Sequence, residues 1–258
     1  MGLWGSDNGT WIIVAAIAGL AICQVNLYLT TAVLHRGLCH RAIAYPPWIA
    51  RSVAAWLWLT SFIPPLTWIA AHRHHHVTAD TPDDPHAPGE KGFVRVLLLS
   101  WYYVPAWSRT NWAAADARYL QPLRREWLLR VLDRSIIANT NFYAQLALSI
   151  AGGPVTLAFW ITRVVPYMLL SGYVNSAGHV LGVRRYGDHG TDASGLWQTL
   201  LGYIVGGETL GHNYHHRYPR HATFRCTGFD PGFWFATLVL RGVPAHRPRI
   251  VQSMELSR

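Results

Sequence analysis

Residues 11–34, from Trp11 to Leu34, form an apolar run without a single Asp, Glu, Lys or Arg. A helix rises about 1.5 Å per residue, so a run of this length crosses the hydrocarbon core of a bilayer. A signal peptide is the alternative, but its apolar region spans only about 7–15 residues and follows a basic segment. No Lys or Arg precedes Trp11. We therefore expect a membrane-spanning helix here.

Further apolar segments indicate a polytopic membrane protein. The chain is 51% hydrophobic and only 14% charged, whereas soluble domains carry about 25% charged residues. Residues 48–71 are apolar but contain Pro64-Pro65, which favours a re-entrant or interfacial path. Residues 135–151 and 155–176 read as a helical hairpin joined by Gly152-Gly153-Pro154. We expect one all-α membrane domain over residues 1–258, with spans at 11–34, 135–151 and 155–176.

The basic residues orient these segments. Apart from Arg51 and Arg163, every Lys and Arg lies in residues 35–47, 72–134 or 184–258. The positive-inside rule places those segments in the cytoplasm, so we expect a cytosolic helical cap formed by residues 72–134 and 177–258, at the inner or plasma membrane. The net charge of +9 suits anionic lipid or an anionic substrate head group. No long basic run favours nucleic acid.

Nine of the 14 histidines fall into three clusters. The clusters are His35-Arg36-Gly37-Leu38-Cys39-His40, His72-Arg73-His74-His75-His76 and His212-Asn213-Tyr214-His215-His216. The second and third share the spacing H-x-x-H-H, which places three imidazoles on one face of a helix, so we expect each trio to converge. Asn175 and His179 are similarly spaced at the end of the predicted hairpin. All four elements end on the side predicted to be cytoplasmic.

This histidine content predicts a site for two metal ions. The ligands exceed the four that a tetrahedral zinc takes, and they suit two ions with five or six ligands each. Imidazole accepts Zn, Cu, Fe or Ni, so composition leaves the metal open. The candidate metal ligands are His35, His40, His72, His75, His76, Asn175, His179, His212, His215 and His216. We identify no catalytic residue beyond them.

The three clusters resemble the histidine boxes of the integral-membrane fatty acid desaturases, most closely the acyl-CoA type. The flanks match too: Asp80, Asp84-Pro85-His86 and Gly92-Phe93 follow the second cluster, and Arg185, Tyr186 and Gly207-Glu208 lie before the third. The resemblance implies a di-iron enzyme that uses O2 and two external electrons to introduce a double bond into a fatty acyl chain. Its substrate would be an acyl-CoA, an acyl-carrier protein or an acyl-lipid.

The resemblance also implies roles for individual residues. One iron would take His35, His76, His179, His212 and His216, and the other His40, His72, His75 and His215 with Asn175 close by. His74 and His86 match no ligand of the family. Asp80, Asp84 and Glu208 are candidates to accept hydrogen bonds from the ligands, the alternative being ordinary caps or surface acids.

The electron donor would be a separate partner, a ferredoxin or a cytochrome b5-type protein with its reductase, because the sequence contains neither a haem-binding His-Pro-Gly-Gly nor a ferredoxin cysteine set. A hydroxylase, acetylenase or ketolase acting on an acyl, alkyl or isoprenoid chain would use the same metal site. A metal transporter is a weaker alternative, because transport sites lie within the spans and these clusters lie at their ends.

Overall fold

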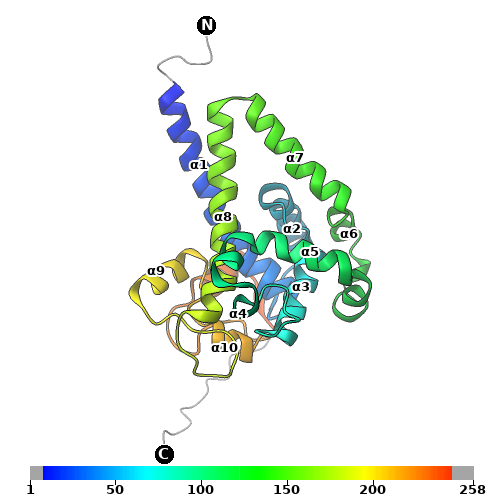
Figure 1. Ribbon diagram of the computed structural model, residues 1–258, viewed down its shortest axis with the longest axis vertical. Helices are drawn as coiled ribbons and strands as arrows, with labels where there is room; N and C mark the ends of the chain where they lie inside the picture. Colours follow the sequence, from blue (N-terminus) through cyan, green and yellow to red (C-terminus); the bar gives the residue numbers. More distant parts are fainter. Residues whose placement is uncertain (1–7, 122, 246–258) are drawn as a thin grey trace, which may run out of the picture.

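The computed structural model describes residues 8–121 and 123–245 of the chain (Figure 1). The described residues are mainly helical, as expected for an all-α membrane protein. The longer helices are α1 (Asn8–Leu29), α2 (Pro47–Ser61), α3 (Pro65–Thr78), α5 (Phe93–Tyr119), α7 (Ser135–Ala151), α8 (Pro154–Val180) and α9 (Leu196–Ile204). Shorter elements are η1 (Thr30–Cys39), β1 (Ile43–Ala44), α4 (Pro88–Lys91), η2 (Leu123–Arg125), α6 (Trp127–Leu132), α10 (His212–Arg217), α11 (Pro231–Trp234), η3 (Phe235–Val239) and β2 (Val243–Pro244). The strands β1 and β2 pair antiparallel, with Ile43 opposite Pro244.

Two continuous helical segments are long and apolar enough to cross a membrane. They are α1 continued by η1, over Asn8–Cys39, and α8. The two lie side by side (Figure 1), and α1 exposes the apolar side chains of Trp11, Ile13 and Ile17. Gly19 permits their close approach, because a Cβ there would lie 2.6 Å from the Phe159 carbonyl oxygen.

The predicted break at Pro64-Pro65 is a sharp bend between α2 and α3, whose axes differ by 94°. Phe62 adopts a left-handed conformation, with φ of +59°, and so ends α2. At the start of α3, the Asp133 carboxylate accepts hydrogen bonds from the backbone N–H and the hydroxyl of Thr67, at 2.8 and 2.9 Å. Asp133 thus caps the helix that carries the second histidine cluster, although it lies far away in sequence.

Helix α7 covers the predicted segment 135–151 and follows the expected turn into α8. It has no buried residue and is not among the described helices long and apolar enough to span a membrane. The crossing at 135–151 and the re-entrant path of 48–71 therefore stay predictions. Within the predicted cap, residues 72–121, 123–134 and 177–245 are described, and residues 246–258 lie outside the described part of the chain.

Replacing Gly19 by alanine should lower the unfolding temperature of the detergent-solubilised protein. The added Cβ would lie 2.1 Å from the Thr162 hydroxyl and 2.6 Å from a backbone oxygen of α8, an overpacking that costs about 1–3 kcal/mol. Gly9→Ala in the same helix is the control, because a Cβ there meets no atom within 4 Å. Equal unfolding temperatures for both variants would contradict the close approach of α1 and α8.

Candidate metal centre

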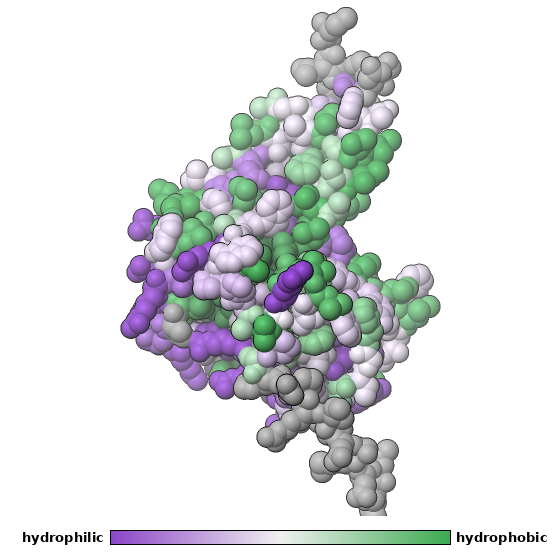
Figure 2. All heavy atoms as spheres, turned by 180° about the vertical axis from the view of Figure 1, so that it is seen from behind, coloured by the Kyte–Doolittle hydropathy of each residue, from purple (hydrophilic) through white to green (hydrophobic). Residues whose placement is uncertain are grey.

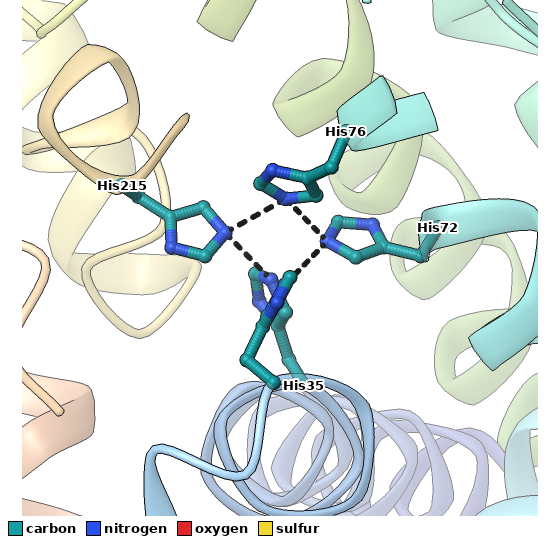
Figure 3. A group of neighbouring side chains, drawn as sticks. His35, His72, His76 and His215 are labelled. Carbon is teal, nitrogen blue, oxygen red and sulfur yellow. Dashed lines mark hydrogen bonds between the residues drawn. The ribbon is translucent and has the colours of Figure 1, made fainter. Parts of the chain in front are cut away.

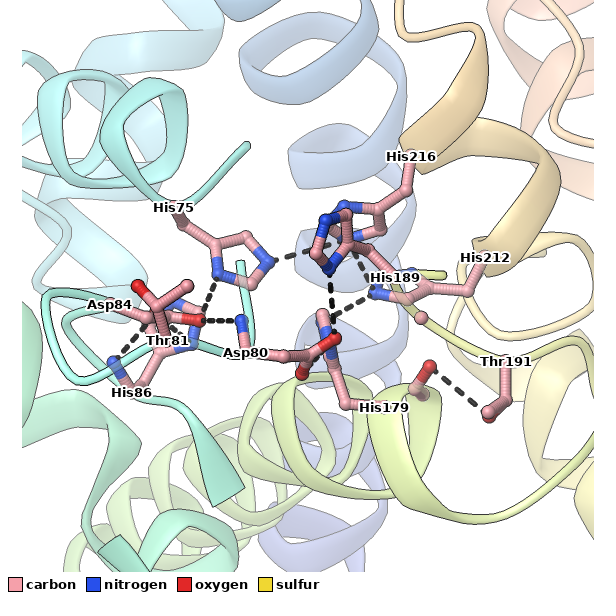
Figure 4. Close-up of polar contacts among 12 residues, drawn as sticks. His75, Asp80, Thr81, Asp84, His86, His179, His189, Thr191, His212 and His216 are labelled. Atoms are coloured by element: carbon pink, nitrogen blue, oxygen red, sulfur yellow. Dashed lines mark hydrogen bonds and ion pairs between the residues drawn. The ribbon is translucent and has the colours of Figure 1, made fainter. Parts of the chain in front are cut away.

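Eight of the nine clustered histidines, together with His179, converge in two adjacent groups, which we name site A and site B. Within each group, one potential ligand atom of every residue lies within 4.8 Å of the others. Site A comprises His35, His40, His72, His76 and His215, most of which Figure 3 labels. Site B comprises His75, His179, His212 and His216 (Figure 4). The rings of His76 and His216 stack across the two groups with their centroids 4.4 Å apart, so the sites are neighbours.

Each H-x-x-H-H cluster divides between the two sites. In α3, His72 and His76 belong to site A and His75 to site B; in α10, His212 and His216 belong to site B and His215 to site A. The expectation that each trio converges on one point is therefore wrong. Residues i and i+4 differ by about 40° around a helix, whereas i+3 and i+4 differ by about 100°. The i, i+4 pair consequently faces one site and the intervening histidine faces the other.

A local change of helix type brings His35 and His40 into the same site. In an α-helix, residues five apart differ by about 140° around the axis and point in different directions. Here the segment η1 is a π-helix, and the His40 backbone N–H donates to the His35 carbonyl at 3.0 Å. This i to i+5 bond places the second residue nearly above the first, so both imidazoles reach site A.

The grouping corrects the division of ligands that the resemblance implied. His35 and His76 lie with His40, His72 and His215, not with His179, His212 and His216. His75 lies in site B instead of site A. The reason is the geometry of α3 and η1 described above, which sequence spacing alone does not fix.

Acidic residues hold the outer nitrogens of several rings. Carboxylates accept from Nδ1 of three histidines at 2.9 Å each: Glu208 from His35, Asp84 from His75 and Asp80 from His179. The predicted contacts of Asp80, Asp84 and Glu208 with candidate ligand histidines are thus confirmed. Burial alone would raise the pKa of Asp84, but the adjacent His75 and His86 hold it well below its usual range. These carboxylates fix both the ring orientation and the position of the proton.

The inner nitrogens are arranged to receive cations. His179 donates from Nδ1 to Asp80, and His212 donates from Nδ1 to the Glu208 backbone oxygen at 3.2 Å. Both rings then present an Nε2 lone pair, yet the two Nε2 atoms lie 3.0 Å apart. Burial, reinforced by neighbouring histidines, lowers the pKa of His212 well below its ordinary value, so protonation does not supply the missing hydrogen. Two facing lone pairs fit a metal ion between them.

Site A has the same character. Contacts between Nε2 atoms run from His35 to His215 at 3.0 Å, from His215 to His76 at 3.1 Å and from His76 to His72 at 3.0 Å (Figure 3). Burial, followed by the effect of other histidines, lowers the pKa of both His40 and His215 well below its ordinary value. Neutral imidazoles with converging lone pairs are the donor set that divalent metals prefer.

A buried ion pair, which the spacing of residues in the sequence did not predict, lies behind site A. Arg36 is fully buried, donates to both carboxylate oxygens of Asp230 at 3.0 Å and lies over the ring of Phe224 at 3.6 Å. Asp230 also accepts from the backbone N–H of Phe224 at 2.7 Å. Phe224 in turn packs against the rings of His35 and His215. No signal in the sequence pointed to Asp230, because it lies far along the chain from the residues it supports.

The other residues considered from the sequence fall into distinct places. Asn175 donates to the Ser100 hydroxyl at 2.5 Å, and its role as a ligand stays a prediction. His74 contacts Tyr119 and belongs to neither site. His86 lies beside Asp84 and His75, outside both sites (Figure 4). The Trp68 ring stacks on His72 with an interplanar angle of 4°, giving site A an aromatic wall.

Replacing Asp84 by asparagine should weaken metal binding at site B selectively. The His75 ring would lose the carboxylate that fixes its proton and orientation, a change that typically costs 10–100-fold in metal affinity. Metal per polypeptide, measured after a chelator challenge, should fall by about one ion. Asp83→Asn is the matched control, because Asp83 is the exposed neighbour. Equal retention of metal by both variants would contradict the role of Asp84.

The chain is similar to known desaturases. The chain is 27% identical over 225 residues to Delta-9 acyl-lipid desaturase 1 of Arabidopsis thaliana, covering 82% of this chain and 66% of the relative. It is 30% identical over 191 residues to sn-2 palmitoyl-lipid 9-desaturase of Nostoc sp. (strain 36), covering 73% of this chain and 64% of the relative. The chain thus spans about two-thirds or less of the length of these relatives. The family model described as fatty acid desaturase matches residues 9–227, and the chain belongs to that family.

Proposed function

We propose that this protein is an O2-dependent di-iron desaturase that introduces a double bond into a fatty acyl chain. The reaction removes two hydrogens from adjacent carbons and, with O2, two electrons and two protons, gives the alkene and two molecules of water. The observation that carries the proposal is the convergence of nine histidines into two neighbouring sites. The family supports an acyl substrate.

The donor set fits two iron ions. Site A would hold one ion with five imidazoles and site B the other with four, which leaves room at site B for a further ligand. Asn175, on α8 four residues before His179, is our candidate for that position, directly or through water. When bound, a di-iron group supplies the oxygen-activating redox chemistry that an unactivated methylene requires.

The protein's own residues would position this chemistry and keep water away. Asp80, Asp84 and Glu208 hold the Nδ1 protons, so that the Nε2 lone pairs stay directed inward. Phe224 and Trp68 add apolar walls around site A. Such walls favour an alkyl chain over water next to the reacting centre.

The remaining parts of the proposal concern the substrate, the donor and the membrane. The names of the relatives refer to acyl-lipid and palmitoyl-lipid substrates, which favours a lipid-linked acyl chain over acyl-CoA or an acyl-carrier protein. The two electrons would come from a ferredoxin or cytochrome b5-type donor with its reductase. The metal centre would face the cytoplasm from an inner or plasma membrane, following the distribution of basic residues.

Expression in a desaturase-deficient host should produce a new unsaturated fatty acid, detected by gas chromatography–mass spectrometry of the total fatty acids. The variant His75→Ala, His76→Ala should form none, because it removes one ligand from each site. His74→Ala is the matched control in the same helix and should retain the product, since His74 belongs to neither site.

Other products would change the assignment. A hydroxylated or alkynyl acyl chain that disappears in the double variant would keep the metal site and identify a hydroxylase or acetylenase. No new product from protein that retains two irons and receives reductant would contradict desaturation of the host's acyl chains. A double bond that persists in the double variant would separate the activity from the two sites.

A further inference from the structure

A groove runs between α2 and α7, away from both metal sites. It has a volume of about 420 Å³ and is lined by Trp58, Ile136, Ile137, Thr140, Asn141 and Ala144. Two hydrogen bonds join α7 to α2: Asn141 donates to the Trp58 carbonyl at 2.8 Å and Gln145 to the Leu59 carbonyl at 2.7 Å. The buried Trp58 Nε1 has no hydrogen-bond partner among the described residues. The groove is thus mainly apolar, with one unused donor in its wall.

Arginines gather at the end of this groove where α7 begins. Arg130 lies in α6, and Arg134 directly precedes the first turn of α7, which supplies Ile136 and Ile137 to the groove. Both arginines are exposed, and neither forms an ion pair within the described part of the chain. Figure 2 shows hydrophilic residues concentrated on the side of the molecule where α6 lies. The rim therefore carries uncompensated positive charge.

Among the neighbouring arginines, Arg51 and Arg124 are paired, whereas the exposed Arg125, like Arg130 and Arg134, forms no ion pair within the described residues. Arg51 donates to Glu126 at 2.9 Å, and Arg124 forms an ion pair with Asp116. The Asp133 carboxylate, adjacent to Arg134 in sequence, accepts instead from Thr67. The first turn of α7 has no side-chain cap, so its backbone N–H groups add to the positive potential.

We propose that this groove binds an anionic membrane phospholipid. One acyl chain would lie along the apolar wall of α2 and α7, and the phosphate would lie between Arg130 and Arg134. Basic residues next to a cleft between membrane helices recognise anionic head groups in this way. The exposed Trp127 at the start of α6 is an aromatic side chain of the kind found at membrane–water interfaces.

This lipid site is separate from the metal centre. None of the residues that line the groove belongs to site A or site B. The segment that carries the two arginines contacts α2 through the Arg51–Glu126 ion pair and α3 through the hydrogen bonds of Asp133 with Thr67. Arg130 and Arg134 would hold a lipid that stabilises the packing of α7. The inference does not depend on the proposed function.

Native mass spectrometry of the detergent-solubilised full chain tests the site. Phosphatidylglycerol and phosphatidylcholine with the same acyl chains are titrated separately. We expect the wild-type protein to retain phosphatidylglycerol preferentially. The variant Arg130→Ala, Arg134→Ala should bind it about thirtyfold more weakly, since each basic residue near an anionic lipid surface contributes about fivefold to binding. Arg130→Lys, Arg134→Lys should keep most of the binding, because the charge remains.

Two further comparisons separate specific binding from general effects. Arg95→Ala, Arg220→Ala removes two exposed arginines elsewhere and should leave the preference unchanged. Ile137→Trp should block the groove, whereas Leu148→Trp, at an exposed position of α7 outside the groove, should not. Equal retention of both lipids by the wild type, or unaltered phosphatidylglycerol binding in the Arg130 and Arg134 alanine variant, would overturn the proposal.

Discussion

The convergence of imidazole lone pairs is the constraint on which the remainder of this structure depends. Nine rings lie within two small groups, and the facing nitrogens of His179 and His212 both carry lone pairs. Such an arrangement is costly unless a cation occupies the centre, because buried acceptors without donors lose their hydrogen bonds to water. The surrounding fold therefore has to fix helices from distant parts of the sequence with enough rigidity to hold these rings together.

The fold meets this requirement with few elements. Two short motifs with the same spacing serve two sites, because each gives its i, i+4 pair to one site and its intermediate histidine to the other. The assignments of α3 and α10 are reciprocal, so the two helices complete each other's sites. A π-helical turn and the end of α8 supply the remaining rings. Carboxylates from two connecting segments, Asp80 and Asp84 between α3 and α4 and Glu208 between α9 and α10, then fix the protons on the outer nitrogens.

The set of histidines was predictable from the sequence, but their distribution between the sites was not. The clustering and spacing of His72, His75 and His76 indicated a metal site, and the neighbouring acids were identified as partners. The division between sites depends on the rotation of α3 about its axis and on the π-helical turn at His40, and neither has a signature in residue spacing. The ion pair between Arg36 and Asp230 could not be predicted from the sequence either, because it joins residues 194 positions apart. Long-range contacts of this kind are set by tertiary packing.

The bend between α2 and α3 shows how an apolar environment accommodates polar groups. Arg163 of α8 is nearly buried and forms no ion pair within residues 8–121 and 123–245. It donates instead to the Gln145 amide oxygen at 2.6 Å, while Gln145 and Asn141 donate to the last carbonyls of α2. The carboxyl end of a helix carries partial negative charge, so a cation and two amides near it stabilise the end of α2. These contacts hold the α2 side of the bend and the Asp133 carboxylate holds Thr67 on the α3 side, so both sides of the bend that precedes the α3 histidines are anchored.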